Sequence, residues 1–214
     1  MIVLSLKTYK ESSGDEVIKL ARIAEKVNQD TGVPIWLCAQ AFDIYRLVQA
    51  VKLPIWAQHL DPIDPDRHSG WLSPYSARQV GAVGAVINHA EHTVPLGTID
   101  TTINKCRQYG LKTLVIADTI DLVKQVIELQ PDYLAFERPD LIGGKVAMVD
   151  VEADHIKQVI DLSPVPVIVG AGIRTGDNVK KTLSLGGVGV ILASAVVKAA
   201  DQEAALRELA SGFK

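Results

Sequence analysis

Eight short apolar segments, each followed by an amphipathic stretch, alternate along the whole sequence. This alternation constrains the fold strongly, because parallel strands need long crossover connections, which are usually helices. The apolar segments are rich in Val, Ile, Leu and Ala, while aromatic residues make up only 5% of the 214 residues. Such a composition is typical of parallel strands buried on both faces. The candidate strands are residues 2–6, 34–38, 54–58, 84–88, 111–116, 133–137, 165–169 and 188–192.

The intervals between these strands carry helical signals. Residues 14–28 place apolar side chains at helical spacing, and we expect Gly32 to terminate this helix in a left-handed conformation. Thr119 is expected to cap the helix of residues 119–129, with Asp121 in its first turn, where the helix dipole favours a negative charge. The other expected helices span 99–109 and 201–209.

Eight strand–helix units of roughly 27 residues each predict an α/β protein whose residues 1–214 form one (β/α)8 barrel, a TIM barrel. A doubly wound open sheet uses the same alternation and is the main competing fold. The first candidate strand is not followed by a Gly-x-Gly-x-x-Gly turn, which favours the barrel. No linker or charge run marks a domain boundary.

The net charge of −3 does not favour binding to nucleic acid or to an anionic membrane. The two cysteines, Cys38 and Cys106, form no Cys-x-x-Cys motif and no metal-binding pattern with histidine. No segment approaches the roughly 18 apolar residues of a membrane span, and the N-terminus lacks the pattern of a signal peptide. We therefore expect a reduced, cytoplasmic protein without a metal.

Polar side chains follow three of the candidate strands. The active site of a (β/α)8 barrel lies at the C-terminal ends of its strands. Ser5 and Lys7 share one face at the end of the first strand, His89 follows the fourth, and Glu137 ends the sixth. Each has a purely structural alternative: a solvated lysine, a hydrogen-bonded core histidine, or a glutamate paired with a neighbouring cation. Their common position at strand ends favours a shared site.

Strands seven and eight run into turns of small residues, Gly170-Ala171-Gly172 and Ala193-Ser194-Ala195. Gly172 permits close approach of the backbone to a ligand, and exposed N–H groups near a helix start attract anions. The turns suit a phosphate, although glycine is common in any turn between a strand and a helix.

Several motifs extend this pattern over nearly the whole chain. They are Leu6-Lys7-Thr8-Tyr9, Ala57-Gln58-His59, Asn88-His89-Ala90-Glu91, Glu137-Arg138-Pro139-Asp140-Leu141-Ile142-Gly143-Gly144, Gly170-Ala171-Gly172-Ile173 and Leu192-Ala193-Ser194. In this order they resemble segments of the triosephosphate isomerase family. The short chain and the Gly-Ala-Gly-Ile turn are most similar to the archaeal members.

The resemblance implies an isomerase that interconverts dihydroxyacetone phosphate and D-glyceraldehyde 3-phosphate in glycolysis and gluconeogenesis. Glu137 would remove a carbon-bound proton next to the carbonyl group, and His89 would polarise that carbonyl and shuttle protons between the oxygens. Lys7 would offset negative charge in the enediolate-like transition state. The family also implies a neutral imidazole whose pKa is lowered by a helix N-terminus, and Pro95 is compatible with a helix start after His89.

Residues 138–145 would form a lid, with Pro139 stiffening its entrance and Gly143 and Gly144 giving a flexible exit. A lid is needed because an exposed enediol phosphate tends to lose its phosphate. An ordinary turn at Gly143 and Gly144 is the structural alternative.

The remaining assignments also follow from the resemblance. Backbone N–H groups in the turn that begins at Gly172, together with those of Gly143, Ala193 and Ser194, would bind the phosphate without a cofactor or metal. Ser5 and Ile142 are further expected substrate contacts. Gln58 and Glu91 would support the site from the mouth, with Glu91 holding Lys7 in place.

Members of the family are dimers or tetramers in which the loop after the third strand reaches into the neighbouring subunit. Here that loop spans 59–73 and contains Trp71, so we expect a homodimer or homotetramer that assembles through it. The loop could instead fold back on its own barrel.

Four departures from the family pattern lie near the site. Ser5 replaces asparagine, Ala90 replaces serine, Ala195 replaces glycine, and Gly144-Lys145 replaces Thr-Gly. These changes raise an alternative, a catalytically impaired barrel that only binds sugar phosphates.

A second alternative is another phosphate-binding barrel, such as an indole-glycerol-phosphate-type lyase or a sugar-phosphate epimerase. That function would require extra catalytic or metal-binding residues at other strand ends. Strands two, three and five end in Cys38, Gln58 and Ala117-Asp118, which give it little support.

Overall fold

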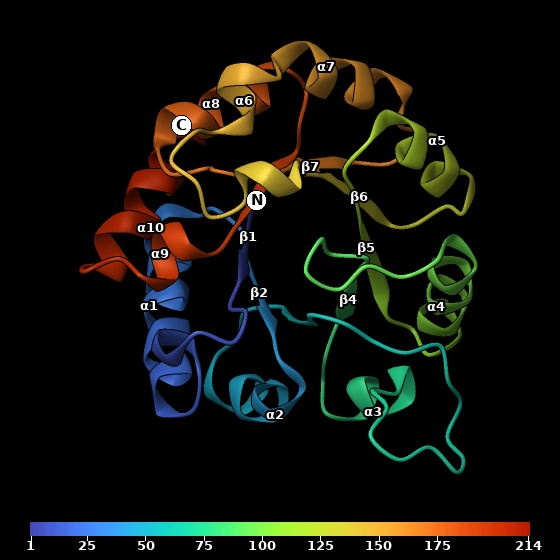
Figure 1. Ribbon diagram of the computed structural model, residues 1–214. Helices are drawn as coiled ribbons and strands as arrows, with labels where there is room; N and C mark the ends of the chain where they lie inside the picture. Colours follow the sequence, from blue (N-terminus) through green and yellow to red (C-terminus); the bar gives the residue numbers. More distant parts are fainter.

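Eight parallel strands close into a barrel in the order β1 to β8 in the computed structural model, which describes residues 1–214 (Figure 1). β1 pairs in parallel with both β2 and β8, so the sheet has no edge and the doubly wound open sheet is excluded. The predicted (β/α)8 barrel is confirmed. The strands are β1 (Ile2–Ser5), β2 (Ile35–Ala39), β3 (Ile55–Ala57), β4 (Gly84–Ile87), β5 (Lys112–Ala117), β6 (Tyr133–Phe136), β7 (Val167–Val169) and β8 (Gly189–Leu192).

Helices surround the strands (Figure 1). The α-helices are α1 (Asp15–Thr31), α2 (Ala41–Ala50), α3 (Pro74–Gln79), α4 (Leu96–Gln108), α5 (Ile120–Glu128), α6 (Met148–Val151), α7 (Ala153–Leu162), α8 (Gly176–Ser184), α9 (Ser194–Val197) and α10 (Gln202–Ser211). Two 3-10 turns are also present, η1 (Lys10–Ser12) and η2 (Pro139–Leu141). No helix combines the length and the apolar character needed to cross a membrane.

Single residues at the helix ends cap or terminate several helices. Gly32 adopts φ +72° and ends α1 by donating its N–H to the Asn28 carbonyl, as predicted. The Thr119 hydroxyl accepts the Leu122 N–H and caps α5. α4 begins earlier than the predicted residue 99, because the Pro95 carbonyl accepts N–H groups from Thr98 and Ile99. Pro95 itself is the N-cap of α4 and lies outside its first turn.

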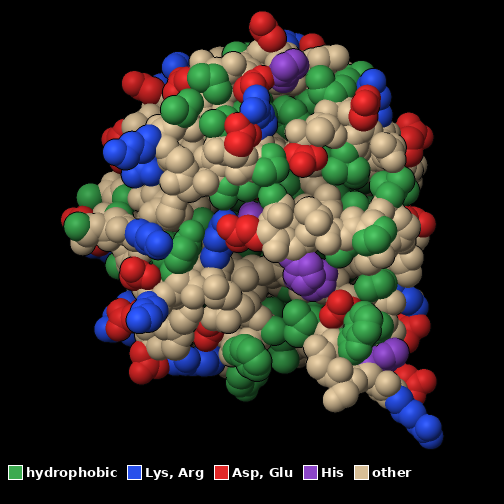
Figure 2. All heavy atoms as spheres, in the orientation of Figure 1, with side chains coloured by type: hydrophobic (Ala, Val, Ile, Leu, Met, Phe, Trp, Pro, Cys, Tyr) green, Lys and Arg blue, Asp and Glu red, His purple; other side chains and the backbone are tan.

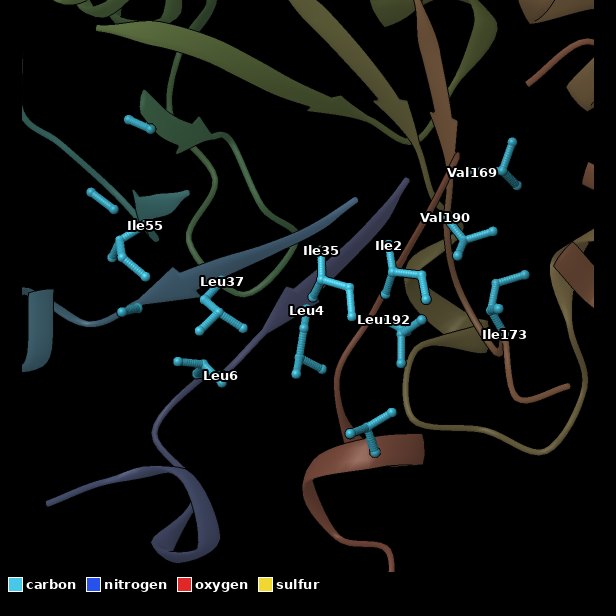
Figure 3. Close-up of a cluster of buried hydrophobic side chains, with 14 of the residues drawn as sticks. Ile2, Leu4, Leu6, Ile35, Leu37, Ile55, Val169, Ile173, Val190 and Leu192 are labelled. Carbon is cyan, nitrogen blue, oxygen red and sulfur yellow. The ribbon is translucent and has the colours of Figure 1, made fainter. Parts of the chain in front are cut away.

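Two layers of apolar side chains hold the barrel together. Ile2 and Leu4 belong to a cluster of 50 buried residues that also includes the inner face of α1, so they point outward from the barrel toward the helices. Figure 3 shows them beside Ile35 and Leu37 of β2. Val3 alternates with them and belongs to a second cluster of nine buried residues, which fills the barrel interior. The same alternation directs Ser5, at the end of β1, toward the interior mouth.

Candidate active site

One pocket lies at the C-terminal ends of the strands. It brings together side chains and turns from the first, fourth, sixth, seventh and eighth strand–helix units. Its lining includes every catalytic and substrate-binding candidate from the sequence: Ser5, Lys7, His89, Glu137, Ile142, Gly143, Gly172, Ala193 and Ser194. On the face that Figure 2 shows, basic, acidic and histidine side chains gather near the middle. The tertiary structure therefore places these widely separated residues around one space.

Lys7 is fixed at the mouth through its side chain and its backbone. It follows β1 in the left-handed region, with φ +49°. Its Nζ atom donates to Oε1 of Glu91 over 2.7 Å, and only 12% of its side chain is exposed. Gln58 Nε2 donates to the carbonyl oxygens of Lys7 and Cys38, at 3.0 and 3.1 Å. Glu91 thus orients the ammonium group while Gln58 anchors the strained turn that carries it.

The His89 imidazole has a defined tautomer. The backbone N–H of Glu91 donates to Nδ1 over 3.0 Å, so the proton of a neutral ring resides on Nε2. The preceding turn is held by Asn88, whose side chain donates to the Ile116 carbonyl and accepts the Val94 N–H. The ring consequently presents an Nε2–H donor to the pocket.

The environment of the same ring favours its neutral form. Burial lowers the pKa of His89, the nearby Lys7 charge lowers it further, and Glu91 opposes the shift. Burial is therefore the leading cause of the low pKa, whereas the family resemblance had suggested a helix N-terminus. α4 begins only at Leu96, after an intervening turn.

Glu137 carries an unpaired carboxylate oxygen inside the protein. Only 5% of the residue is exposed, and its Oε2 atom has no hydrogen-bond partner. Burial raises the pKa of Glu137 to about 7, against the opposing effects of Lys7 and the Ala171 backbone N–H. The structural alternative of pairing with a neighbouring cation does not hold for Arg138, which pairs with Asp140 and Glu152.

Gly170 makes room for this carboxyl group. A Cβ atom on Gly170 would lie 2.1 Å from Oε1 of Glu137, far inside van der Waals contact. The turn continues through Ala171, a non-glycine residue at φ +66°, and Gly172 at φ +73°. A Cβ atom on Gly172 would lie 2.0 Å from the Val146 carbonyl oxygen. The turn therefore touches the glutamate on one side and the residue that follows the lid segment, Val146, on the other.

Two helices begin close to the turns of small residues at this pocket. α8 begins at Gly176 after the N-cap Thr175, whose hydroxyl and the Asn178 side chain form a capping box. α9 begins at Ser194, directly after Ala193. At the start of α8 the N–H groups of Gly176 and Asn178 are already used, because they donate to Glu208 and Thr175. The first N–H groups of a helix have no partner within it, so the start of α9 offers donors to an anion. Ala195 also lines the pocket here.

The segment expected to form a lid covers one side of the pocket. η2 occupies Pro139–Leu141, and Ile142, Gly143 and Gly144 line the cavity. Gly143 adopts φ +72°, a conformation that favours glycine. The segment has the position that a lid requires.

Several residues near the site were missed by sequence reasoning. Tyr9 and Arg174 line the main pocket, and the Lys198 ammonium lies 4.4 Å from the centroid of the Tyr9 ring. The position of Arg174, two residues after Gly172, was the available signal. For Tyr9 the available signal was its place in the Leu6-Lys7-Thr8-Tyr9 motif.

Two further histidines, His59 and His92, lie beside the site. His59 and His92 stack with ring centroids 3.9 Å apart. They line a neighbouring cavity of about 230 Å³ that also contains Lys7, Gln58 and Glu91. Burial lowers the pKa of His59, and His92 lowers it further. Ala90 faces a different small cavity, next to Asn88 and Glu137.

The chain is similar to known proteins over almost its whole length. The sequence model described as triosephosphate isomerase matches residues 1–210. Triosephosphate isomerase of Methanocaldococcus jannaschii is 41% identical over 214 residues, covering 98% of each chain. That of Methanobacterium bryantii is 39% identical and covers 99% of this chain and 96% of its own. The crystal structure of triosephosphate isomerase from Bartonella henselae has a similar fold, with a TM-score of 0.77 at 14% identity, covering 99% of this chain and 98% of that one. Sequence similarity over almost the full length shows that this chain belongs to the triosephosphate isomerase family.

Proposed function

We propose that this protein interconverts dihydroxyacetone phosphate and D-glyceraldehyde 3-phosphate, through an enediol(ate) intermediate, in glycolysis and gluconeogenesis. The observation that carries the proposal is that an unpartnered, buried carboxylate oxygen of Glu137 faces the imidazole of His89. Their facing atoms, Oε2 and Nε2, are 3.9 Å apart in one pocket. The family of the chain supports the same reaction.

Glu137 is the proposed base. It takes the proton from the carbon next to the substrate carbonyl, and the electron pair of the broken C–H bond moves toward the carbonyl oxygen. A pKa of about 7 suits this step, because the carboxylate is a stronger base than an exposed glutamate and about half of it is ionised at neutral pH. The protonated Glu137 then returns the proton to the adjacent carbon.

His89 and Lys7 are proposed to stabilise the charge that develops on oxygen. The Nε2–H of His89 donates to the carbonyl oxygen and then exchanges a proton between the two oxygens of the enediolate. The Lys7 ammonium, held by Glu91, offsets the negative charge of the transition state. Both groups are fixed before substrate arrives, so little reorganisation is needed.

The phosphate is proposed to bind at the two small-residue turns. Gly172 and the start of α9 after Ala193 supply backbone donors, and Gly143 completes the set from the lid segment. Ser5 and Ile142 contact the rest of the substrate. Closure of the lid excludes water and so limits loss of phosphate from the enediolate.

A coupled isomerase assay on the purified protein tests the proposal. We expect turnover of either triose phosphate, and a loss of several orders of magnitude in Glu137→Ala. Glu137→Gln, which keeps the size of the side chain but cannot accept the proton, should be equally impaired. A wild-type rate no higher than that of Glu137→Ala would refute the proposed activity.

We also propose that the protein acts in the cytoplasm as a single-domain subunit of a homodimer or homotetramer, assembled through residues 59–73. Asp64 tethers this loop to α4 by contacts with Lys105 at 2.5 Å and Tyr109 at 2.7 Å, which gives the loop a defined shape. Trp71 on the same loop is 55% exposed, and Phe42 on α2 is 89% exposed. Sedimentation analysis should show a dimer or tetramer that Trp71→Ser weakens. A monomeric wild type at micromolar concentration would contradict this assembly.

A further inference from the structure

An ion pair joins the start of the lid segment to the chain beyond its end. Arg138 lies directly after Glu137, at the start of the segment, and Glu152 lies beyond its end, between α6 and α7. The Nη1 atom of Arg138 contacts Oε1 of Glu152. Its Nε and Nη2 atoms donate to the two oxygens of Asp140, at 3.0 and 2.8 Å. The guanidinium group thus spans the base of the lid.

The Glu152 side of this contact is anchored to the barrel. Asp150 of α6 accepts the side-chain N–H of Asn178 over 3.0 Å and also contacts Lys181, and both of these partners belong to α8. The Met148 N–H donates to the Ala171 carbonyl over 3.0 Å. These bonds fix the chain after the lid to the turn beside Glu137.

The Arg138 side of the contact lies next to the proposed base. The Glu137 N–H donates to the Ala117 carbonyl over 3.1 Å, which is the last backbone bond of the barrel before the lid begins. Without a further restraint, residue 138 would serve as the pivot of the lid, and each opening would also turn the backbone of Glu137. The contact with Glu152 moves the pivot beyond Arg138.

We propose that the Arg138–Glu152 ion pair makes Arg138 a positioning residue, which keeps the Glu137 carboxylate in place while the rest of the lid, residues 139–145, opens and closes. This inference rests on the proposed isomerase function. Proton abstraction is sensitive to displacements of roughly 1 Å, so a mobile base lowers turnover more than it weakens substrate binding. A loosened lid also exposes the enediolate, whose electrons can then expel phosphate as the C–O bond breaks.

A purely structural ion pair predicts a different result. The Arg138 side chain is 41% exposed, and ion pairs of this kind contribute little to stability. Loss of the pair would then leave both turnover and product distribution unchanged. The ratio of inorganic phosphate released to substrate isomerised separates the two interpretations, because it reports on the lid and not on folding.

The experiment compares wild type with Arg138→Ala, Glu152→Gln and the exchanged pair Arg138→Glu/Glu152→Arg. In Arg138→Ala we expect kcat to fall about tenfold with KM changed less than about twofold, and phosphate release per turnover to rise severalfold. Glu152→Gln should show a weaker form of both effects, and the exchanged pair should recover part of kcat. His155→Ala is the matched control, because it removes the other side chain in contact with Glu152 while leaving Arg138 in place.

Unchanged kcat and phosphate release in Arg138→Ala would overturn the inference, as would an equal loss in His155→Ala. If Arg138→Ala does not fold, Arg138→Lys provides the same comparison with a single donor in place of the guanidinium fork, and wild-type kcat and phosphate release in that variant would count against the inference. An inactive wild type would instead refute the proposed function. The two failures are therefore distinguishable.

Discussion

The Nε2 atom of His89 lies 3.9 Å from the Oε2 atom of Glu137, too far for a hydrogen bond, and this oxygen has no other partner. The two groups face one another without neutralising one another. A donor and an acceptor held in this way can both reach a small ligand placed between them. Several consequences of the geometry are open to measurement.

Shortening the Glu137 side chain should impair turnover far more than binding. In Glu137→Asp the carboxylate is withdrawn by about one methylene group, and a displacement of roughly 1 Å costs on the order of a hundredfold in rate. We expect kcat to fall by about that factor with a small change in KM, as measured by steady-state kinetics. Equal effects on the two parameters would show that Glu137 is not the base.

The buried carboxyl group should make the protein less stable as pH rises. Glu137 has a pKa of about 7 in the folded protein, against an ordinary value of 4.5. Between these values the folded state binds more protons than the unfolded state, so stability falls with rising pH. The destabilisation by this carboxyl group is absent below the lower pKa and complete above the higher one. The difference between the two values corresponds to roughly 3 kcal/mol.

Glu137→Gln does not titrate and provides the control for this effect. The free energy of unfolding of both proteins is measured in urea at about pH 5 and about pH 8. Relative to wild type, the variant should be more stable at the higher pH than at the lower one by roughly 3 kcal/mol. A difference in unfolding free energy that is independent of pH would mean that the carboxyl group titrates normally in the fold.

A methyl group at position 170 should displace the base. The added Cβ in Gly170→Ala would lie 2.1 Å from Oε1 of Glu137, so the carboxylate has to move. We expect a loss in kcat on the order of a hundredfold. Gly97→Ala is the matched control, because a Cβ at Gly97 meets no atom within 4 Å. Equal activity of the two variants would show that the glutamate tolerates the displacement.

Restoring the amide of the family at position 5 should maintain or improve activity. Ser5 lines the pocket beside Lys7 and is 8% exposed, and its hydroxyl offers one donor where an asparagine amide offers two. We expect kcat/KM of Ser5→Asn to equal or exceed that of wild type by up to severalfold in the isomerase assay. A large loss would indicate that serine has a different role in this chain.

The sequence predicted the strands and the helix caps because their signals are local. The capping of α5 by Thr119 and the termination of α1 at Gly32 depend on a few neighbouring residues. The start of α4 was missed because the apolar spacing begins later than the backbone hydrogen bonds to Pro95. Local chemistry thus predicted the elements themselves better than their ends.

By itself the sequence determined that eight strands alternate with helices, and that Lys7, His89 and Glu137 stand where barrel strands end. That much follows because hydrophobic period and strand polarity are properties of the chain itself. The closure of β1 onto β8, the unpaired oxygen of Glu137 and the Arg138–Glu152 ion pair were decided only by the tertiary structure. Burial and charge proximity depend on which loops pack against one another across the barrel mouth, and residue order alone does not specify those distances.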